Sequence, residues 1–506
     1  MSIRQIVLNF SGNDTAGLAG VAMDVRVQNA FEIHSVSVIT ANTAQNNEKV
    51  ISINSITDSV FQDQLDAVDA LPIKAVKVGL IGSVVQAEKI RSFIQDKKIP
   101  LILDPVLASS SGAKFLDESF LVFLKEQLLP HATLLTPNIS EAEAITHIKI
   151  KTTQDIIESA IALLALGANA VLIKGGHFID NKKGEVVQDY FSDGKMSFWL
   201  SNQKIETQNS RGTGCALSSA IASSIVLGYS LYDAVVIAKM AISQGLRQAY
   251  AIEDASVKAS ITEDSDAKSY GPVNITHFPC EQCDLPLLTH RPVSTLAIPP
   301  FPNCNEPLLG LYPVVDRAEW IARLASTGVN TMQLRVKDLS GEALESEIQL
   351  AIALGLKHNC RLFINDYWQL AIKHNAYGVH LGQEDLEDAN ISEIKKAGLR
   401  LGLSTHCHYE VARAHSYKPS YIACGPVYHT TTKDMPWVPH GLKGLKYWRK
   451  VLKYPLVAIG GINAERFGPI ANTGVDSVAM ITAITLADKP SDVAAGFMRE
   501  FKESQA

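Results

Sequence analysis

Short apolar runs alternate with segments of helical spacing along most of the chain, most regularly from residue 308 to residue 506. The apolar runs of this part predict eight strands, at 310–316, 331–337, 361–366, 377–382, 399–405, 421–427, 455–461 and 476–482. Between them, segments such as 342–359 repeat apolar residues every three or four positions, as amphipathic helices do. Eight strand–helix units in a row predict a closed (β/α)8 TIM barrel. An open, doubly wound sheet of eight strands is the alternative.

The first part of the chain alternates in the same way and then changes. Its predicted parallel strands lie at 5–10, 35–40, 75–80, 101–106, 133–138 and 170–175. Residues 185–200 then have the pattern of a β-hairpin, and the glycine-rich turn 211–215 opens a helix of small residues. A parallel sheet with an antiparallel edge predicts a doubly wound α/β domain.

Proline marks the join between the two parts. Eight of the 21 prolines lie at 272, 279, 286, 292, 299, 300, 302 and 307. This density is unsuited to a helix or an interior strand. The sequence therefore predicts a domain at 1–279, a proline-rich linker at 280–306, and a second domain at 307–506.

Composition excludes several classes of protein. Lys and Arg number 46 against 52 Asp and Glu, a net charge of −6, so we expect no nucleic-acid partner, which would call for a basic stripe. The most apolar region, 216–242, is broken by serines, Asp233 and Lys239, which predicts no membrane span. The beginning of the chain does not read as a secretory signal. Seven cysteines without regular spacing predict reduced thiols and a cytoplasmic location.

The turn Arg211–Cys215 is the first candidate for chemistry. Gly212 and Gly214 precede a helix, whose first N–H groups and dipole favour a bound anion. Phosphoryl transfer depends on this kind of cradle. A thiol at a helix start can have a lowered pKa, so Cys215 is a candidate base. The alternatives are a plain tight turn and a cysteine that only shapes it.

A second candidate site lies at the ends of the barrel strands. Polar residues follow six of these strands, and side chains at the carboxyl ends of barrel strands converge on one face. Asp366 and Asp385 follow different strands and together suit a hard cation with oxygen ligands. Arg335, Lys337 and Lys433 add positive charge, so magnesium and a diphosphate are the expected ligands.

The strand-end motifs of the first part resemble a known family as a set. They are GNDTAGLAG (12–20), DPVLASSSG (104–112), TPNISEAE (136–143), IKGGH (173–177) and RGTGC (211–215). In this order they resemble the hydroxymethylpyrimidine and phosphomethylpyrimidine kinases of the ribokinase-like superfamily, over about residues 3–278. The resemblance implies ATP as phosphoryl donor, a nucleotide contact at Lys174, an anion hole at Gly212 and Gly214, and a catalytic Cys215. It also implies pyrimidine contacts at Asp24, Gln45 and Val106, and magnesium near Asp104 and Glu141.

Two positions depart from that family. Leu18 replaces a glycine of the opening turn, and Arg211 replaces the histidine that usually precedes GTGC. Two other interpretations of the first domain therefore stay open. It could be a degenerate module that only binds pyrimidine, or a kinase for another vitamin such as pyridoxal.

The motifs of the second part resemble thiamine-phosphate synthase. They are QLRVKD (333–338), FINDYWQLAIKH (363–374), YGVHLGQED (377–385), GLSTH (402–406), TTTKDMP (430–436) and VAIGGI (457–462). The resemblance implies magnesium on Asp366 and Asp385. It also implies substrate contacts at Gln333, Leu334, Arg335, Val336, Lys337, Asn365, Ser404, Thr430, Thr432, Lys433, Gly461, Ile481 and Thr482. A strand-end cap is the alternative role for Ser404.

Together the resemblances imply a fused enzyme for thiamine phosphate. The first domain would phosphorylate hydroxymethylpyrimidine and its monophosphate, and the second would couple the diphosphate to thiazole phosphate. Arg335 and Lys433 would stabilise the departing pyrophosphate. The sequence leaves open a homo-oligomer, channelling of intermediates, and metal binding at Cys280 and Cys283, which we do not favour because no second cysteine pair follows.

Overall fold

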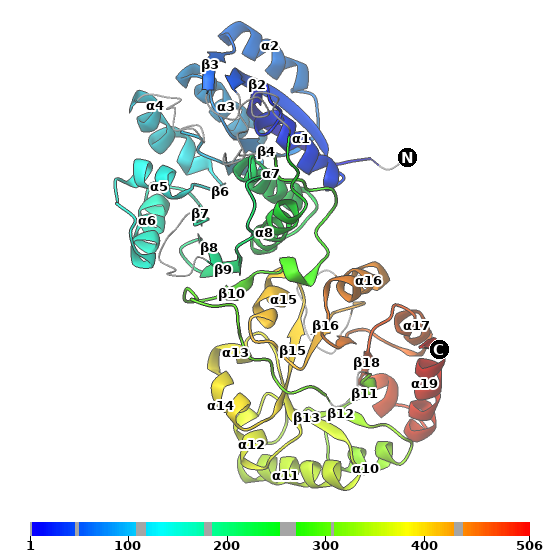
Figure 1. Cartoon of the computed structure of the whole chain (residues 1–506). Coiled ribbons are helices and arrows are strands. Elements are labelled where there is room, and N and C mark those ends of the chain that lie inside the picture. The colour runs from blue at the N-terminus through cyan, green and yellow to red at the C-terminus, as the bar shows by residue number, and fades with distance from the viewer. Residues whose placement is uncertain are drawn as a thin grey trace, which may run out of the picture. The chain divides into compact units, whose positions relative to one another are not determined.

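The computed structural model describes residues 3–45, 50–107, 118–176, 185–252, 270–304, 308–429 and 439–505 (Figure 1). The chain forms two compact units. The first comprises Met1–Pro279 and Asp284–Leu296, and the second comprises Cys280–Cys283 and Ala297–Ala506.

A ten-stranded sheet forms the centre of the first unit. Its order is β10-β9-β8-β7-β6-β5-β4-β1-β2-β3. The strands are β1 (Ile6–Asp14), β2 (His34–Gln45), β3 (Val50–Ser55), β4 (Ile73–Val78), β5 (Leu101–Leu103), β6 (Leu134–Leu135), β7 (Val171–Lys174), β8 (Val186–Ser192), β9 (Ser197–Gln203) and β10 (Leu287–Thr289). The strands β1, β2 and β4 to β7 are parallel, whereas β3 and β8 to β10 run antiparallel to their neighbours.

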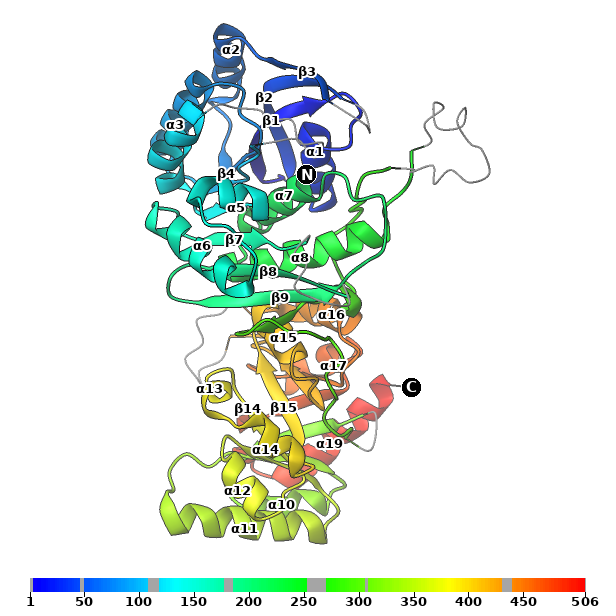
Figure 2. The same cartoon turned by 60° about the vertical axis from the view of Figure 1, so that its left-hand side comes forward.

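Helices cover both faces of this sheet (Figure 2). They are α1 (Gly20–Ala30), α2 (Asp58–Val68), α3 (Val84–Lys97), α4 (Glu118–Phe123), α5 (Ile139–Thr146), α6 (Thr153–Ala165), α7 (Thr213–Val226) and α8 (Leu231–Arg247). Apolar residues of α2, α3, α5 and α6 pack on one face, where Phe10 of β1 contacts Phe61 and Phe93. The helices α1, α7 and α8 pack together on the other face.

The predicted doubly wound sheet is confirmed, including the hairpin of β8 and β9. Two strands were not predicted. β3 is a half-exposed edge strand, so its apolar alternation is weak. β10 lies inside the predicted linker, where Leu287 and Leu288 are buried and pair with β9 between flanking prolines. An edge strand tolerates prolines at its ends, because only its paired side needs N–H donors.

The second unit is a closed eight-stranded parallel barrel, as the strand pattern predicts. Its strands are β11 (Gly310–Val315), β12 (Thr331–Leu334), β13 (Arg361–Asn365), β14 (Gly378–Leu381), β15 (Arg400–Thr405), β16 (Tyr421–Cys424), β17 (Leu456–Ala458) and β18 (Ser477–Met480). β18 pairs with β11 from Gly310 opposite Ser477 to Pro313 opposite Met480. That pairing closes the sheet and excludes the open alternative.

Helices follow the strands around the barrel (Figure 1). They are α10 (Glu319–Ala325), α11 (Gly341–Lys357), α12 (Trp368–Lys373), α13 (Asp385–Asp388), α14 (Ile391–Lys396), α15 (His408–His415), α16 (Gly441–Val451), α17 (Ala464–Ala471), α18 (Thr482–Thr485) and α19 (Pro490–Ser504). Among the helices of the described residues, none is long and apolar enough to cross a membrane.

Aromatic side chains fill one layer of the barrel interior. Tyr312, Phe363 and Tyr421 are almost fully buried, and the Phe363 and Tyr421 rings lie 5.0 Å apart between centroids. Gly402 of β15 lies beside them, and a Cβ built there would fall on the Tyr421 ring. The sheet therefore has room for Tyr421 only because residue 402 has no side chain.

We predict that Gly402→Ala lowers the free energy of unfolding of the barrel by about 1–3 kcal/mol or more, because a well-packed interior cannot accept the added methyl group. Urea unfolding followed by tryptophan fluorescence measures the effect. The control is Gly496→Ala in α19, where an added Cβ would meet no described atom within 4 Å apart from its chain neighbours and the nearby backbone of its own helix. In a helix this change should stabilise by about 0.5–1 kcal/mol. Equal effects of the two variants would contradict the prediction.

Candidate active sites

Six parallel strands of the first unit end at one edge of the sheet, where two carboxylates and a lysine meet. Lys174 is the last residue of β7, and its Nζ lies 2.7 Å from Asp104 Oδ1 and 3.9 Å from Glu141 Oε2. Burial raises the pKa of Glu141 to about 7, although Lys174 lowers it. The carboxylate oxygens suit a magnesium ion, and the ammonium suits a phosphate.

The N-terminus of α7 faces this group. Gly212 precedes the helix with φ of 79°, and a Cβ there would collide with the Leu18 carbonyl oxygen. A Cβ at Gly214 would lie 3.4 Å from Lys174 Nζ and 3.5 Å from Asp104 Oδ2. The two glycines therefore let the helix start lie close to both the opening turn and the Lys174–Asp104 pair. This geometry suits an anion held between the helix N-terminus and a lysine.

The two departures from the kinase pattern have internal partners. The Asp14 carboxylate accepts hydrogen bonds from the backbone N–H groups of Ala16, Leu18 and Ala19, at 2.9–3.1 Å. The Leu18 side chain is buried, so the turn is closed on itself. The guanidinium of Arg211 lies over the Tyr270 ring, 5.6 Å from its centroid. Both substituted residues are therefore held by contacts within the first unit.

Cys215 follows Gly214 at the start of α7. Burial raises the pKa of its thiol to about 11, against a smaller lowering by Lys77. This direction is opposite to the one expected from a helix N-terminus alone, because desolvation of the thiolate outweighs the helix field. Cys215 is therefore a thiol at neutral pH in this structure, and its role as a base stays a prediction.

Asp24 lies in a buried network below that turn. Its carboxylate accepts hydrogen bonds from Ser11 at 2.6 Å, from Ser219 at 2.7 Å and from Lys77 at 3.0 Å. Both Asp24 and Lys77 are fully buried. Because Cys215 and Ser219 are four residues apart in α7, they lie on one face of that helix. The pyrimidine contact of Asp24 stays a prediction. In the structure, the Asp24 carboxylate holds α7 through its hydrogen bond with Ser219.

Lys77 was not among the predicted site residues. The sequence does contain a sign of it, because Lys77 stands inside the apolar strand AVKVGL, where an unpaired charge would be costly.

Gln45 ends β2, and Val106 follows β5, both partly buried at the same edge of the sheet. Their predicted pyrimidine contacts also stay predictions.

The barrel brings the predicted metal ligands together at the carboxyl ends of its strands. Asp366 follows β13 with φ of 65°, and accepts hydrogen bonds from Lys337 at 2.5 Å and from the Asn365 amide at 2.7 Å. Asp385 accepts from the backbone N–H of Gly382 at 2.8 Å. Burial raises the pKa of Asp385, and the nearby Asp366 carboxylate raises it further. Two carboxylates that repel each other, one of them paired with Lys337, fit a divalent cation.

Other predicted synthase residues line the same end of the barrel. Gln333 is buried in β12, and Arg335 follows that strand, partly exposed, while Leu334 and Val336 have buried side chains. Ser404 in β15 is partly exposed. Gly461 has φ of 67° after β17, and Ile481 and Thr482 begin α18. Thr430, Thr432 and Lys433 lie outside the described residues.

Sequence reasoning missed three residues beneath Ser404 and Gln333. His380 contacts Ser404, and Tyr312 contacts Gln333, each through a side-chain hydrogen bond. Tyr421 lies between His380 and Tyr312. His380 could have been noticed, since it stands inside the motif YGVHLGQED. In a sequence, however, inward-pointing strand residues such as these look like ordinary core positions.

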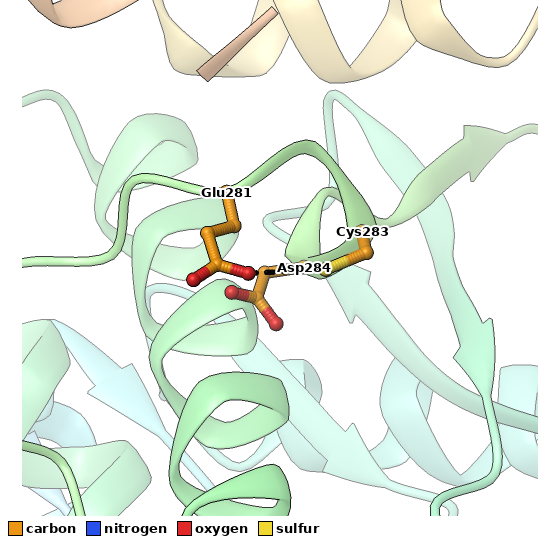
Figure 3. A group of neighbouring side chains, drawn as sticks. All are labelled: Glu281, Cys283 and Asp284. Atoms are coloured by element: carbon orange, nitrogen blue, oxygen red, sulfur yellow. Dashed lines mark hydrogen bonds between the residues drawn. The ribbon is translucent and has the colours of Figure 1, made fainter. Parts of the chain in front are cut away.

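The turn at 281–284 carries three side chains that could bind a metal ion (Figure 3). Atoms of Glu281, Cys283 and Asp284 lie within 4.8 Å of one another. The Cys283 thiol is 3.5 Å from Glu281 Oε2, and Asp284 is paired with Arg247 at 2.9 Å. Cys280 is not part of this group. The group therefore differs from the Cys280–Cys283 metal site considered from the sequence.

We predict that Lys77→Met destabilises the first unit by about 3–5 kcal/mol, because it leaves the Asp24 charge buried without its partner. The double variant Asp24→Asn with Lys77→Met should recover most of this loss. Urea unfolding followed by hydrogen exchange of β1 and α7 peptides measures both. Lys149→Met removes an exposed pair with Glu143 and should cost less than about 1 kcal/mol. A double variant no better than Lys77→Met would contradict the pairing argument.

We also predict a pH dependence of barrel stability from His415. Burial lowers the pKa of His415 from 6.5 to about 3, and Lys418 lowers it further. Its ring nitrogens contact the Tyr454 hydroxyl and the Lys418 ammonium. Between pH 6.5 and pH 3 the histidine is protonated in the unfolded chain but neutral in the folded one. The contribution of His415 to the free energy of unfolding is therefore complete above pH 6.5 and is lost as pH falls toward 3.

His415→Gln should therefore reduce the loss of unfolding free energy between about pH 6.5 and pH 4. Urea unfolding at both pH values, read by tryptophan fluorescence, measures it. His358→Gln, at an exposed position, is the matched control. An unchanged slope in the His415 variant would show that other groups control the acid sensitivity.

Comparisons with known proteins found matches to both units. A family described as phosphomethylpyrimidine kinase matches residues 14–259, and one described as thiamine monophosphate synthase matches residues 311–484. The thiamine-phosphate synthase of Serratia proteamaculans is 58% identical over 189 residues, which cover 37% of this chain and 89% of that protein. The thiamine-phosphate synthase of Photorhabdus laumondii is 59% identical over 186 residues, which cover 36% of this chain and 85% of that protein.

Solved structures similar to the first unit include two kinases. The phosphomethylpyrimidine kinase of Clostridium difficile is 33% identical, with a TM-score of 0.42 over 47% of this chain and 98% of that one. The pyridoxal kinase of Staphylococcus aureus is 21% identical, with a TM-score of 0.48 over 55% of this chain and 95% of that one. From the family matches and the curated relatives, the chain belongs to the thiamine-phosphate synthase family through its barrel and to the phosphomethylpyrimidine kinase family through its first unit, so that one chain carries two enzymes.

Proposed function

We propose that this chain makes thiamine phosphate in consecutive steps. A kinase domain at 1–279 transfers phosphoryl groups from ATP to hydroxymethylpyrimidine and then to its monophosphate. A synthase domain at 307–506 couples the resulting diphosphate to thiazole phosphate. The observation that carries the proposal is the presence, in one chain, of an anion-binding helix start beside Lys174 and a carboxylate–lysine group around Asp366.

In the kinase domain the chain supplies position and charge. The first N–H groups of α7 and the Lys174 ammonium would hold phosphate oxygens on two sides. Asp104 and Glu141 would hold a magnesium ion, which would offset the charge of the ATP phosphates. Cys215 lies at the helix start, and in this proposal the acceptor hydroxyl would lie beside it when it loses its proton. A protonated thiol can orient that hydroxyl, and it can accept the proton only if substrate binding lowers its pKa.

In the synthase domain the reaction exchanges one bond for another. The bond between the pyrimidine methylene carbon and the diphosphate oxygen breaks, and the pyrophosphate keeps the electron pair. The thiazole nitrogen then supplies a pair to the methylene carbon and forms the new C–N bond. Arg335 and Lys337, together with Lys433, would stabilise the developing negative charge. Magnesium on Asp366 and Asp385 would neutralise the pyrophosphate as it leaves.

The same proposal gives the protein small-molecule substrates, with neither nucleic acid nor membrane as a partner. A cytoplasmic location is supported by the cysteines, since Cys215, Cys280, Cys304, Cys360 and Cys424 are in the thiol form.

We predict that the purified chain forms thiamine phosphate from hydroxymethylpyrimidine, thiazole phosphate, ATP and magnesium. Asp366→Asn should slow the coupling at least about 100-fold, because it removes a charged magnesium ligand, while pyrimidine diphosphate accumulates. Cys215→Ala should slow formation from hydroxymethylpyrimidine but not from preformed pyrimidine diphosphate. Chromatography of pyrimidine phosphates and thiamine phosphate measures each step. Cys283→Ser, at an exposed position, is the control for Cys215→Ala.

Each outcome tests one domain. Product from preformed diphosphate alone would show that the first domain does not act as this kinase. Rapid phosphorylation of pyridoxal in its place would assign the domain to another vitamin. No product from preformed diphosphate would overturn the synthase assignment.

A further inference from the structure

Five polar side chains form one hydrogen-bonded chain through the interior of the barrel. Gln333 Nε2 lies 3.4 Å from the Tyr312 hydroxyl, and the Tyr312 and Tyr421 hydroxyls lie 2.8 Å apart. The Tyr421 hydroxyl is 2.6 Å from His380 Nδ1, and His380 Nε2 is 2.8 Å from Ser404 Oγ. The two ends are predicted substrate contacts, whereas the three residues between them have no role in the proposed reaction.

The three middle members of this hydrogen-bonded chain are shielded from water. Tyr421 is fully buried, Tyr312 is 1% exposed, and His380 is 4% exposed. Its members come from β12, β11, β16, β14 and β15, so the chain spans much of the barrel interior. A buried polar group that lost its partner would stay unsatisfied, which makes every link in such a chain interdependent.

The direction of the chain follows from the first donor. The Gln333 amide nitrogen can only donate, so the Tyr312 oxygen accepts from it and the Tyr312 hydroxyl donates to Tyr421. The Tyr421 hydroxyl then donates to His380 Nδ1. A neutral imidazole carries one N–H, which this arrangement places on Nε2, where it donates to Ser404 Oγ. Because the Ser404 oxygen already accepts, its own proton is directed elsewhere.

We propose that Tyr312, Tyr421 and His380 are positioning residues of the synthase site, which hold the Ser404 hydroxyl as a hydrogen-bond donor to an acceptor atom of the bound pyrimidine diphosphate. The backbone of Ser404 is held as well, since Gln383 Nε2 donates to its carbonyl oxygen at 2.7 Å. A serine whose backbone and hydroxyl orientation are both set in advance loses less freedom when the ligand binds. This inference rests on the proposed synthase activity.

Tyr421→Phe breaks the chain at its middle with little change of volume. The His380 Nδ1 then loses its donor, and the imidazole can carry its proton on either nitrogen. We expect kcat/KM for coupling to fall about 3- to 10-fold, as for the loss of one neutral hydrogen bond. Tyr454→Phe is the matched control, because it removes another tyrosine–histidine hydrogen bond of the same barrel, to His415, 3.0 Å in length. The control should keep wild-type kinetics.

Nitrogen NMR of protein labelled at histidine gives a readout that needs no activity. The His380 signals, assigned by their loss in His380→Gln, should show the proton on Nε2 in the wild type and on both nitrogens in Tyr421→Phe. Gln333→Glu replaces the first donor with a carboxylate, which only accepts hydrogen bonds. Tyr312 should then donate to it, and the direction of every hydrogen bond from residue 333 to Ser404 should reverse. The His380 proton should then move to Nδ1.

These measurements separate the inference from the proposed function. Absence of coupling by the wild type would overturn the synthase proposal, while the NMR spectra would still report the direction of the chain. A wild-type proton on Nδ1, or Tyr421→Phe with wild-type kinetics in an active synthase, would overturn the positioning role. A Tyr421→Phe variant that loses stability but keeps its tautomer and kinetics would show that the hydroxyl serves folding alone.

Discussion

Parallel pairing of strands is the constraint on which both active sites depend. Parallel neighbours need crossover helices, so every strand in such a sheet begins at one edge and ends at the other. In the first unit this places Asp104, Lys174 and the start of α7 together, although they span more than a hundred residues of the sequence. In the barrel it places Asp366 beside Asp385 and Lys337. Neither group would exist without the hydrogen-bonded register of its sheet.

Below each site lies a buried polar network that is held by packing. Lys77 and Asp24 lie inside the first unit and connect β4 and α1 to α7 through Ser219. In the barrel, hydrogen bonds among Tyr312, Tyr421 and His380 connect β11, β16 and β14. Burial strengthens each of these hydrogen bonds and makes an unpaired member costly. The networks therefore connect the rigid core to the residues that are predicted to bind substrate.

Much of this arrangement was predictable from the chain alone, because it depends on local pattern. The eight barrel strands follow from apolar runs, and the α7 turn follows from Gly212 and Gly214. Cys215 shows where local reasoning failed. A helix N-terminus lowers a thiol pKa, but burial, together with the charges of Asp24 and Asp104, raises the pKa of Cys215 to about 11. No local pattern shows how deeply a residue is buried. β10 was missed for a related reason, since its edge partner β9 is more than eighty residues away.

The sequence by itself determined the two domains' fold classes, the family resemblances and the strand-end residues, because periodicity and short motifs are properties of neighbouring positions. Only the tertiary structure decided that Lys77 pairs with Asp24, that Lys337 pairs with Asp366 beside Asp385, and that two tyrosine hydroxyls and the His380 imidazole join Gln333 to Ser404. These contacts join strands far apart in the chain. Their energies depend on burial and distance, which arise only when the sheet and the barrel close around them.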